Sequence, residues 1–416
     1  MEAFDIKEFD EIRPYEAGEM KGAFETLLQD RQFSKLLQGF VPWIPKGVRN
    51  GLLRLAFMGV KTPLDFQLRF MKPVVWYAVR KCTDGLTFDD SRLSQSSTLT
   101  AAPHAQGENP QTRYTFVSNH RDIVLDSAFL DVLLNKNHYP TTVEIGIGDN
   151  LLIYPWIKTL VRMNKAFTVR RGLTAHEMMR SSQLMSRYIH YAVTQKHENI
   201  WIAQREGRAK DSSDHTQESV LKMLAMGGDL SELNIVPLTI SYEYDPCDYL
   251  KAREMQQKRD NPAFKKSKQD DLDNMRTGIM GYKGRVHYHC APSVNTWLGE
   301  LKNLPKKEYF EQLAHRMDRE IHANYRLFPG NWIAFDMLVQ KGVWHLEDDE
   351  RRKADGRNTL VKNAAYTPDD VKRFENYLAG QLAKIHIPDK DEDFLRQQML
   401  TMYANPVRNL LATLTL

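Results

Sequence analysis

A histidine and a carboxylate follow a short apolar run in the segment FVSNHRDIVLD, which spans residues 116–126. The run ends in Ser-Asn-His, so the imidazole of His120 is expected where a β-strand gives way to a turn. An imidazole can take a proton from an alcohol at neutral pH, and a nearby carboxylate can fix its tautomer and stabilise the imidazolium. The pattern indicates hydroxyl-activating catalysis, although a histidine at such a turn is also typical of a structural cap.

Two adjacent arginines end a second apolar run, in the segment NKAFTVRRG at residues 164–172. Alternation along a strand sends the side chains of Arg170 and Arg171 to opposite faces. One guanidinium could then point into a site and hold a phosphate through a bidentate fork, while the other stays in solvent. Taken alone, an Arg-Arg pair is typical of an ordinary surface.

A third run, WIAQREGRAK at residues 201–210, opens into Glu-Gly-Arg. Gly207 would let the backbone approach a ligand, Glu206 could bind a hydroxyl or order its neighbour, and Arg208 suits a phosphate. In a fourth run, at residues 235–240, Pro237 removes one ladder donor. That proline predicts an edge strand or a bulge at a pocket wall.

Elements that could position these residues alternate through the middle of the chain. Strands are predicted at Tyr114–Ser118, Thr142–Ile147, Ala166–Arg170, Asn199–Ala203, Asn234–Tyr242 and Arg285–Cys290. Helices are predicted between them at Asp126–Leu134, Leu151–Met163, Ala175–Thr194 and Ser219–Met226. This alternation predicts an α/β fold in which a central mixed sheet is flanked by helices and the strand ends carry the chemistry.

Helical patterns flank this α/β region on both sides. Apolar spacings of three and four residues predict a helical N-terminal cap over residues 1–88, and a polar stretch from Asp89 to Thr112 predicts a loop. The α/β domain is expected over residues 89–295, with a charged helical insertion at about 245–284 that we expect to be a mobile excursion. Residues 296–416 form a predicted helical extension, in which Thr367-Pro368-Asp369-Asp370 marks a helix start.

Composition excludes several classes of protein. Among 416 residues there are 57 basic and 53 acidic side chains, and a net charge of +4 argues against a nucleic-acid partner. The three cysteines, Cys82, Cys247 and Cys290, lack metal-ligand spacing and are too few for a disulfide framework, which favours a reducing cytoplasmic compartment and no metal site. Residues 1–15 are acidic and lack the apolar run of a signal peptide, so export is not expected.

The region from Phe40 to Phe70 mixes apolar and cationic residues. No stretch reaches the roughly 20 apolar residues of a membrane span, because cations interrupt it at Lys46, Arg49, Arg54, Lys61 and Arg69. The apolar members are Trp43, Ile44, Leu52, Leu53, Leu55, Phe57 and Met58. The mixture suits a helix lying in the interface of an anionic membrane, and equally an amphipathic helix packed on the core.

Taken in order, the four blocks resemble the motifs of the glycerol-phosphate acyltransferase superfamily, which includes lysophosphatidic acid and glycerol-3-phosphate acyltransferases. The resemblance covers about residues 85–295. The four family motifs correspond to Asn119, His120 and Asp126; to Phe167, Arg170 and Arg171; to Glu206, Gly207 and Arg208; and to Val236 and Pro237.

The resemblance implies an O-acyltransferase of phospholipid synthesis that needs no metal or cofactor. His120 would deprotonate the acceptor hydroxyl, Asp126 would orient the imidazole, and Arg171 and Arg208 would hold the acceptor phosphate. The other residues that it implies in substrate binding are Asn119, Phe167, Arg170, Glu206, Gly207 and Pro237. The donor would be acyl-CoA or acyl carrier protein, and the acceptor a lysophospholipid (1-acylglycerol-3-phosphate) or glycerol phosphate (glycerol-3-phosphate).

The same resemblance implies a cytoplasmic protein, peripheral on the inner face of the membrane and in contact with anionic lipid. Two alternatives share the motifs. One is an O-acyltransferase of an aminolipid, and the other is a catalytically inactive member that binds lipid or carrier protein at the membrane.

The chain departs from the family pattern in two places. Five residues separate His120 from Asp126 where the family usually has four, and Asp122 is an earlier candidate. Six positions on an ideal helix rotate by about 600°, so His120 must precede the helix or the turn must bulge. We favour Asp126. Arg208 directly follows Gly207, where many members place Thr or Gly before the arginine.

Overall fold

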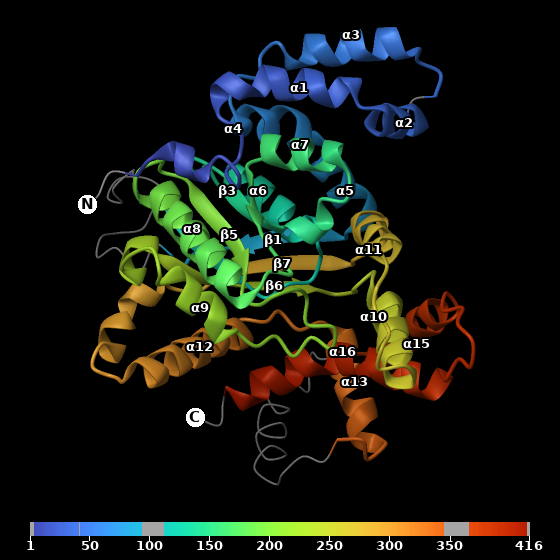
Figure 1. The fold of residues 1–416 in the computed structure, drawn as a ribbon. Helices are drawn as coiled ribbons and strands as arrows, with labels where there is room; N and C mark the ends of the chain where they lie inside the picture. The colour runs from blue at the N-terminus through green and yellow to red at the C-terminus, as the bar shows by residue number, and fades with distance from the viewer. Residues whose placement is uncertain (1–3, 41, 94–111, 345–365, 414–416) are drawn as a thin grey trace.

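A seven-stranded mixed sheet forms the centre of the computed structural model, which describes residues 4–40, 42–93, 112–344 and 366–413 (Figure 1). Its strands are β1 (Gly85–Asp89), β2 (Thr115–Ser118), β3 (Val143–Gly148), β4 (Ala166–Val169), β5 (Asn199–Ala203), β6 (Ile235–Tyr242) and β7 (Arg285–Cys290). They lie in the order β1-β7-β6-β2-β5-β3-β4. The β6–β7 pair is antiparallel and the other neighbouring pairs are parallel. The predicted α/β fold with a mixed sheet is confirmed.

The predicted strands agree closely with the observed ones, and β5 and β7 have the predicted bounds. The sequence does not predict β1, because five residues of mixed pattern give a weak strand signal. This strand pairs in parallel with β7, from Gly85 beside Arg285 to Asp89 beside His289. The end of the predicted helical cap therefore enters the sheet. Residues 94–111, most of the loop predicted from Asp89 to Thr112, lie outside the described residues.

Helices cover both faces of the sheet. On one face, α5 (Lys72–Cys82) and α6 (Leu125–Lys136) bury apolar side chains against β1, β2, β3, β6 and β7. On the other face, α8 (Ala175–Thr194), α9 (Glu218–Leu224) and α12 (Lys306–Ala323) pack against β2, β4, β5 and β6. Strands covered on both faces carry nearly continuous apolar sequences, which is the pattern seen in β2, β5 and β6.

The N-terminal helices form a layer beyond one side of the sheet (Figure 1). They are α1 (Met20–Gln29), α2 (Arg31–Phe40), α3 (Lys46–Phe57) and α4 (Pro63–Phe66), and their apolar core continues onto α7 (Pro155–Met163). Phe57 stacks on Phe24 with ring centroids 3.8 Å apart, and the buried Arg49 donates to Ser34. Part of the predicted interface segment thus faces inward. Within the described residues, no helix is long and apolar enough to span a membrane.

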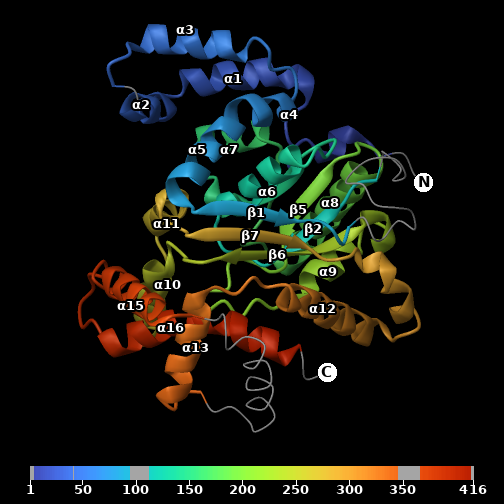
Figure 2. The ribbon, with the colours of Figure 1, turned by 180° about the vertical axis from the view of Figure 1, so that it is seen from behind.

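The C-terminal helices pack on the side of the sheet opposite to α1 and α3 (Figure 2). Here α13 (Pro329–Gln340), α15 (Pro368–Leu382) and α16 (Glu392–Ala412) share a core with α10 (Asp248–Asp260) of the charged insertion. The predicted start of α15 is confirmed, because Oγ1 of Thr367 accepts a hydrogen bond from the backbone N of Asp370 at 3.3 Å. The second insertion helix, α11 (Lys268–Met280), packs beside α5. Both helices of the insertion therefore pack on the fold.

Short helical turns complete the described chain. They are η1 (Ile6–Phe9), η2 (Ala17–Glu19), the π-helical η3 (Gln67–Met71), η5 (Asp149–Leu151), η6 (Leu230–Leu233), η7 (Val294–Thr296) and η8 (Leu298–Leu301).

Candidate active site

Parallel strands end together at one edge of the sheet, and residues of the predicted motifs follow them. His120 follows β2, Glu206 follows β5 and Arg171 follows β4, while Gly148 is the last residue of β3. The carboxyl ends of parallel strands share an edge, which is where α/β proteins bind their ligands. The fold therefore brings three separate sequence motifs to the same edge.

His120 lies in the turn between β2 and α6, and its ring contacts Asp126. Nδ1 of His120 is 2.8 Å from Oδ2 of Asp126; the histidine side chain is 12% exposed and the carboxylate is completely buried. The imidazole meets the indole of Trp201 edge-to-face, with ring centroids 5.6 Å apart. Within the part of the chain that the structure describes, Nε2 has no hydrogen-bond partner. With the Nδ1 proton donated to the carboxylate, Nε2 presents a lone pair that can accept a proton.

The six-position separation of the pair fits because His120 precedes the helix. α6 begins at Leu125, so residues 121–124 form the connecting turn. Oδ2 of Asp126, in the first turn of α6, also accepts a hydrogen bond from the backbone N of Arg121 at 2.6 Å. This second bond closes the turn and holds the carboxylate against the imidazole.

Asp122, the other candidate partner, has a different position. Its Oδ1 accepts hydrogen bonds from the backbone N atoms of Val124 and Leu125, at 2.9 and 2.8 Å, so it caps the start of α6. Burial, together with the charge of Asp126, raises the pKa of Asp122 above its ordinary value. A Cβ added to Gly278 of α11 would lie 2.2 Å from Oδ2 of Asp122, so the insertion packs directly on this turn.

Sequence reasoning missed the residue that follows the histidine. The buried guanidinium of Arg121 donates two hydrogen bonds to the carboxylate of Asp214, with Nη2–Oδ2 and Nη1–Oδ1 distances of 2.6 and 3.3 Å. The hydroxyl of Tyr325 donates to the same carboxylate at 2.7 Å. Burial opposes the charge of Arg121, but Asp214 together with the neighbouring Tyr325, Asp245 and Asp126 raises the pKa of Arg121. Arg121 and Asp214 are far apart in the sequence, so their contact could be found only from the folded structure.

The two arginines after β4 point to different partners, as alternation predicts. Arg170 pairs with Glu11 in the N-terminal segment. Nη1 of Arg171 lies 3.6 Å from Oε1 of Glu206. Gly148 leaves space for this arginine, because a Cβ there would be 2.8 Å from Nε of Arg171. The second and third motifs therefore meet at Arg171 and Glu206, while Arg170 is directed elsewhere.

Gly207 and Arg208 continue the third motif. Gly207 has a φ of +67°, a left-handed conformation that favours glycine. Nη2 of Arg208 donates to Oδ1 of Asn274 in α11 at 2.9 Å, whereas Nη1 is buried without a partner among the described residues. Burial opposes the charge of Arg208, but the neighbouring Cys247 and Asp245 raise its pKa above the ordinary value. Arg208 thus keeps one donor free.

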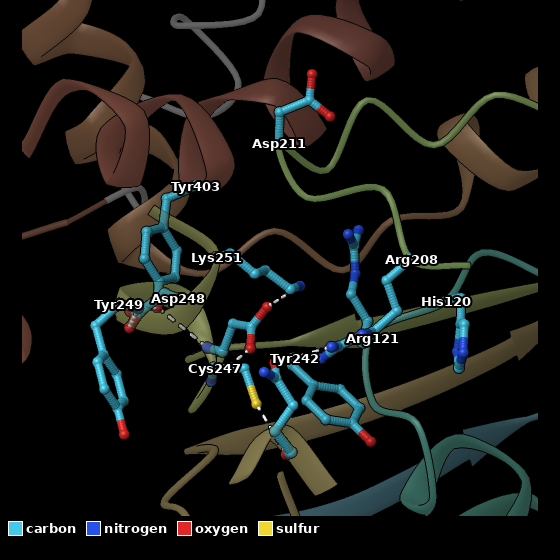
Figure 3. A network of polar contacts seen from close by, with 12 residues as sticks. His120, Arg121, Arg208, Asp211, Tyr242, Cys247, Asp248, Tyr249, Lys251 and Tyr403 are labelled. Carbon is cyan, nitrogen blue, oxygen red and sulfur yellow. Dashed lines mark hydrogen bonds and ion pairs between the residues drawn. The ribbon is translucent and has the colours of Figure 1, made fainter. Parts of the chain in front are cut away.

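A polar network extends from Arg208 toward the C-terminal helices (Figure 3). Nζ of Lys251 lies 2.5 Å from Oδ2 of Asp245. The hydroxyl of Tyr403, from α16, donates to Oδ2 of Asp248 at 2.8 Å. The insertion and the C-terminal extension therefore brace the side of the site on which Arg208 lies. Among the residues that the structure describes, no group of three or more His, Cys, Asp or Glu side chains could hold a metal ion.

The chain matches a known family over the segment that carries these residues. Residues 100–241, about a third of the 416-residue chain, match the family model described as Acyltransferase. We refer to residues 100–241, which are similar to this family, as the acyltransferase-like segment. Comparison with curated proteins gave no match. Among solved structures, the chain is similar to PlsC, a 1-acyl-sn-glycerophosphate acyltransferase from Thermotoga maritima, with a TM-score of 0.37 and 11% identity, covering 74% of this chain and 99% of that chain.

Two predicted substrate-binding residues of the acyltransferase-like segment are enclosed in the fold. Asn119 is completely buried; its Nδ2 donates to the carbonyl of Ile240 at 2.9 Å and its Oδ1 accepts from the N of Ile240 at 2.8 Å. Phe167 is also completely buried, with its ring centroid 5.5 Å from that of Tyr188. Asn119 thus ties β2 to β6, and Phe167 packs in the core.

Pro237 of the acyltransferase-like segment does not lie on an edge strand, so one of its two predicted positions is wrong. β6 lies between β2 and β7, and Pro237 is buried beside Val117. Its carbonyl accepts a hydrogen bond from the N of Ala291 at 3.0 Å, so its missing N–H faces β7, where the ladder begins at Leu238. The proline therefore ends a ladder inside the sheet.

Proposed function

We propose that the protein transfers a fatty acyl group from an acyl thioester, acyl-CoA or acyl carrier protein, to a hydroxyl of a glycerol-phosphate-type acceptor in phospholipid synthesis. One observation carries the proposal: the His120–Asp126 pair, with Nε2 facing away from the carboxylate, at a strand edge that also holds Arg171. The acceptor would be 1-acylglycerol-3-phosphate or glycerol-3-phosphate.

The proposed reaction uses one base, an acceptor hydroxyl and an acyl thioester. Nε2 of His120 takes the hydroxyl proton as the acceptor oxygen attacks the thioester carbonyl carbon. Asp126 stabilises the imidazolium through its 2.8 Å contact with Nδ1. When the carbon–sulfur bond breaks, the thiolate leaves and the imidazolium returns its proton to the sulfur. The products are an ester and a free thiol, and His120 is neutral again.

Two guanidinium groups support a phosphate on the acceptor. Arg171 is half-buried and held by Glu206 at 3.6 Å, a long and exposed contact that a doubly charged phosphate can replace. Arg208 has a buried Nη1 without a partner among the described residues, so it can donate to a phosphate oxygen without giving up Asn274. Arg170, paired with Glu11, is left out of this assignment.

The proposal includes a peripheral position on the cytoplasmic face of the membrane, where the acyl chains of substrate and product would reside. Support comes from a row of exposed apolar side chains on and around α3, at Trp43, Val48, Leu52, Leu55 and Met58. Lys46 supplies positive charge on the same helix, whereas Arg54 is paired with Glu25.

An acyl-transfer assay across donors and acceptors tests the proposal. The purified full chain would receive labelled acyl-CoA or acyl carrier protein with glycerol-3-phosphate, 1-acylglycerol-3-phosphate, monoacylglycerol or a lyso-aminolipid. We expect transfer to a phosphorylated glycerol acceptor and a loss of about 10²- to 10⁴-fold in His120→Ala. Equal transfer to monoacylglycerol would contradict the proposed phosphate-binding site. Preference for the lyso-aminolipid would favour the alternative acceptor. Inactivity with every pair of donor and acceptor would contradict the proposed acyltransferase activity.

A further inference from the structure

A second side chain donates to the carboxylate that contacts His120. The hydroxyl of Tyr242 lies 3.0 Å from Oδ1 of Asp126, while Oδ2 accepts from Nδ1 of His120 and from the N of Arg121. Asp126 is completely buried, so water does not replace a missing donor there. Each oxygen of this carboxylate therefore has its own protein donor.

The sheet register places Tyr242 where it can make this contact. Ile240 pairs with Tyr288 and Tyr242 pairs with Val286, so the two tyrosines project from the same face of the sheet, toward α6. The hydroxyl of Tyr288 donates to the backbone carbonyl of Asp126 at 2.9 Å. Burial raises the pKa of both phenols well above the ordinary value, so the hydroxyl of Tyr242 stays protonated as a donor.

We infer that Tyr242 is a positioning residue, whose hydroxyl holds the carboxylate of Asp126 in the orientation that aligns Oδ2 with the imidazole of His120. A carboxylate held through one oxygen can turn about its Cβ–Cγ bond, and misalignment weakens its stabilisation of the imidazolium. Tyr242 does not contact the reacting atoms. The inference rests on the proposed function, because it gives Tyr242 a part in the His120 reaction.

Tyr242→Phe removes one oxygen and keeps the ring, so the packing of the residue against Phe129 is retained. The chain offers a matched control in Tyr188→Phe. Tyr188 is completely buried where Tyr242 is 8% exposed, and its hydroxyl donates to the buried carboxylate of Glu144, which lies at the start of β3. Both variants lose a buried tyrosine–carboxylate hydrogen bond, and only one of them touches the His120 pair.

The kinetic test measures kcat and both Michaelis constants for the full chain. We expect kcat to fall about tenfold to a hundredfold in Tyr242→Phe, with both Michaelis constants within about twofold of wild type, and to change less than about twofold in Tyr188→Phe. In a His120→Ala background, Tyr242→Phe should cost less than about twofold, because residues that act as a unit are not additive. The inference would be overturned if the two tyrosine variants had a similar kcat. It would also be overturned if Tyr242→Phe lowered kcat in the His120→Ala background by the same factor as in the wild-type protein.

A spectroscopic readout separates this inference from the proposed activity. In NMR spectra of protein labelled with ¹⁵N-histidine, the signal of the hydrogen-bonded Nδ1 proton of His120 is assigned by its absence from the spectrum of His120→Ala. We expect that signal to shift or broaden in Tyr242→Phe and to stay in place in Tyr188→Phe. An unchanged signal in Tyr242→Phe would defeat the inference even for an active enzyme, and a changed signal would support it even if no acyl transfer were found.

Discussion

Hydrogen bonds to single atoms decide which carboxylate serves His120. Asp122 uses Oδ1 for two backbone amides at the start of α6, and Asp126 reaches back from the first turn of that helix to Nδ1 of His120. The extra residue in the motif lengthens the turn, and the bond from the N of Arg121 to Asp126 closes it. A longer spacing therefore keeps the histidine–aspartate contact that the shorter family spacing suggests.

Replacement of each carboxylate tests this assignment. Asp126→Asn should reproduce most of the His120→Ala loss of about 10²- to 10⁴-fold in turnover, and the double variant should add little. Asp122→Asn should be mild, because an asparagine oxygen still accepts from Val124 and Leu125. Steady-state kinetics of the four variants measures this. A severe Asp122→Asn defect beside a nearly silent Asp126→Asn would reverse the assignment.

The adjacent arginines provide a second test at the residue scale, with a control one position away. Arg171→Ala should raise the acceptor Michaelis constant by about tenfold or more and leave that of the thioester nearly unchanged, because a charge-assisted contact to phosphate is lost. Arg170→Ala, which breaks only the exposed pair with Glu11, should change neither constant by more than about twofold. Equal effects of Arg171→Ala on both substrates would argue against a phosphate role.

Secondary structure was predictable where the local signal is strong. The apolar run of β5, the alternating pattern of β7 and the long amphipathic pattern of α8 give their observed bounds. Strand order depends on contacts between distant residues, so the sequence reveals neither β1 beside β7 nor the central place of β6. The same limit hid Tyr242, because a tyrosine in a strand shows its role only when the facing helix is known.

Buried polar links hold α6 in place, and one of them should make stability depend on pH. Oδ1 of Asp131 accepts from the N of Val143 at 3.0 Å, and Oδ2 accepts from Gln67 at 3.1 Å. Burial raises the pKa of Asp131 from 3.8 to about 7 in the folded protein. Between these values the folded state binds more protons than the unfolded state. The contribution of Asp131 to stability is thus fully present below about pH 4 and lost as the pH rises through about 7.

Asp131→Asn mimics the protonated acid and removes this titration. The free energy of unfolding of the variant minus that of wild type should be larger at about pH 8 than at about pH 5. Chemical denaturation at both values measures the difference. Asp273→Asn, at an exposed carboxylate of α11, should leave the pH dependence unchanged. A pH dependence that is the same in Asp131→Asn and wild type would contradict the folded-state pKa.

At the scale of the whole molecule, the chain adds a helical layer on each side of the sheet (Figures 1 and 2). The C-terminal layer is tied to the site through the insertion, by contacts such as Tyr403 with Asp248. The N-terminal layer packs inward through Phe57 and Arg49 and leaves Trp43, Leu55 and Met58 exposed. The two layers thus differ: one braces the site, and the other presents an apolar surface.

Membrane binding tests what that apolar surface does. Trp43 is 75% exposed and Met58 76% exposed, and an anionic lipid surface would bury both side chains while attracting Lys46. The protein should sediment with vesicles that contain anionic lipid and detach in part at high salt, because salt screens the surface attraction. Trp43→Ala should bind less, and Met58→Glu still less, since it places a carboxylate against lipid of the same sign.

Met179→Glu is the matched control for Met58→Glu. Met179 is 63% exposed on α8, outside the N-terminal layer, so its replacement adds the same charge without touching the proposed membrane surface. It should sediment as wild type does. Equal losses in the two variants would mean that net charge, and not the surface around α3, governs binding. Sedimentation that does not change with salt or with lipid charge would contradict the electrostatic contribution to membrane binding. Sedimentation of Trp43→Ala at the wild-type level would contradict the contribution of the apolar side chains.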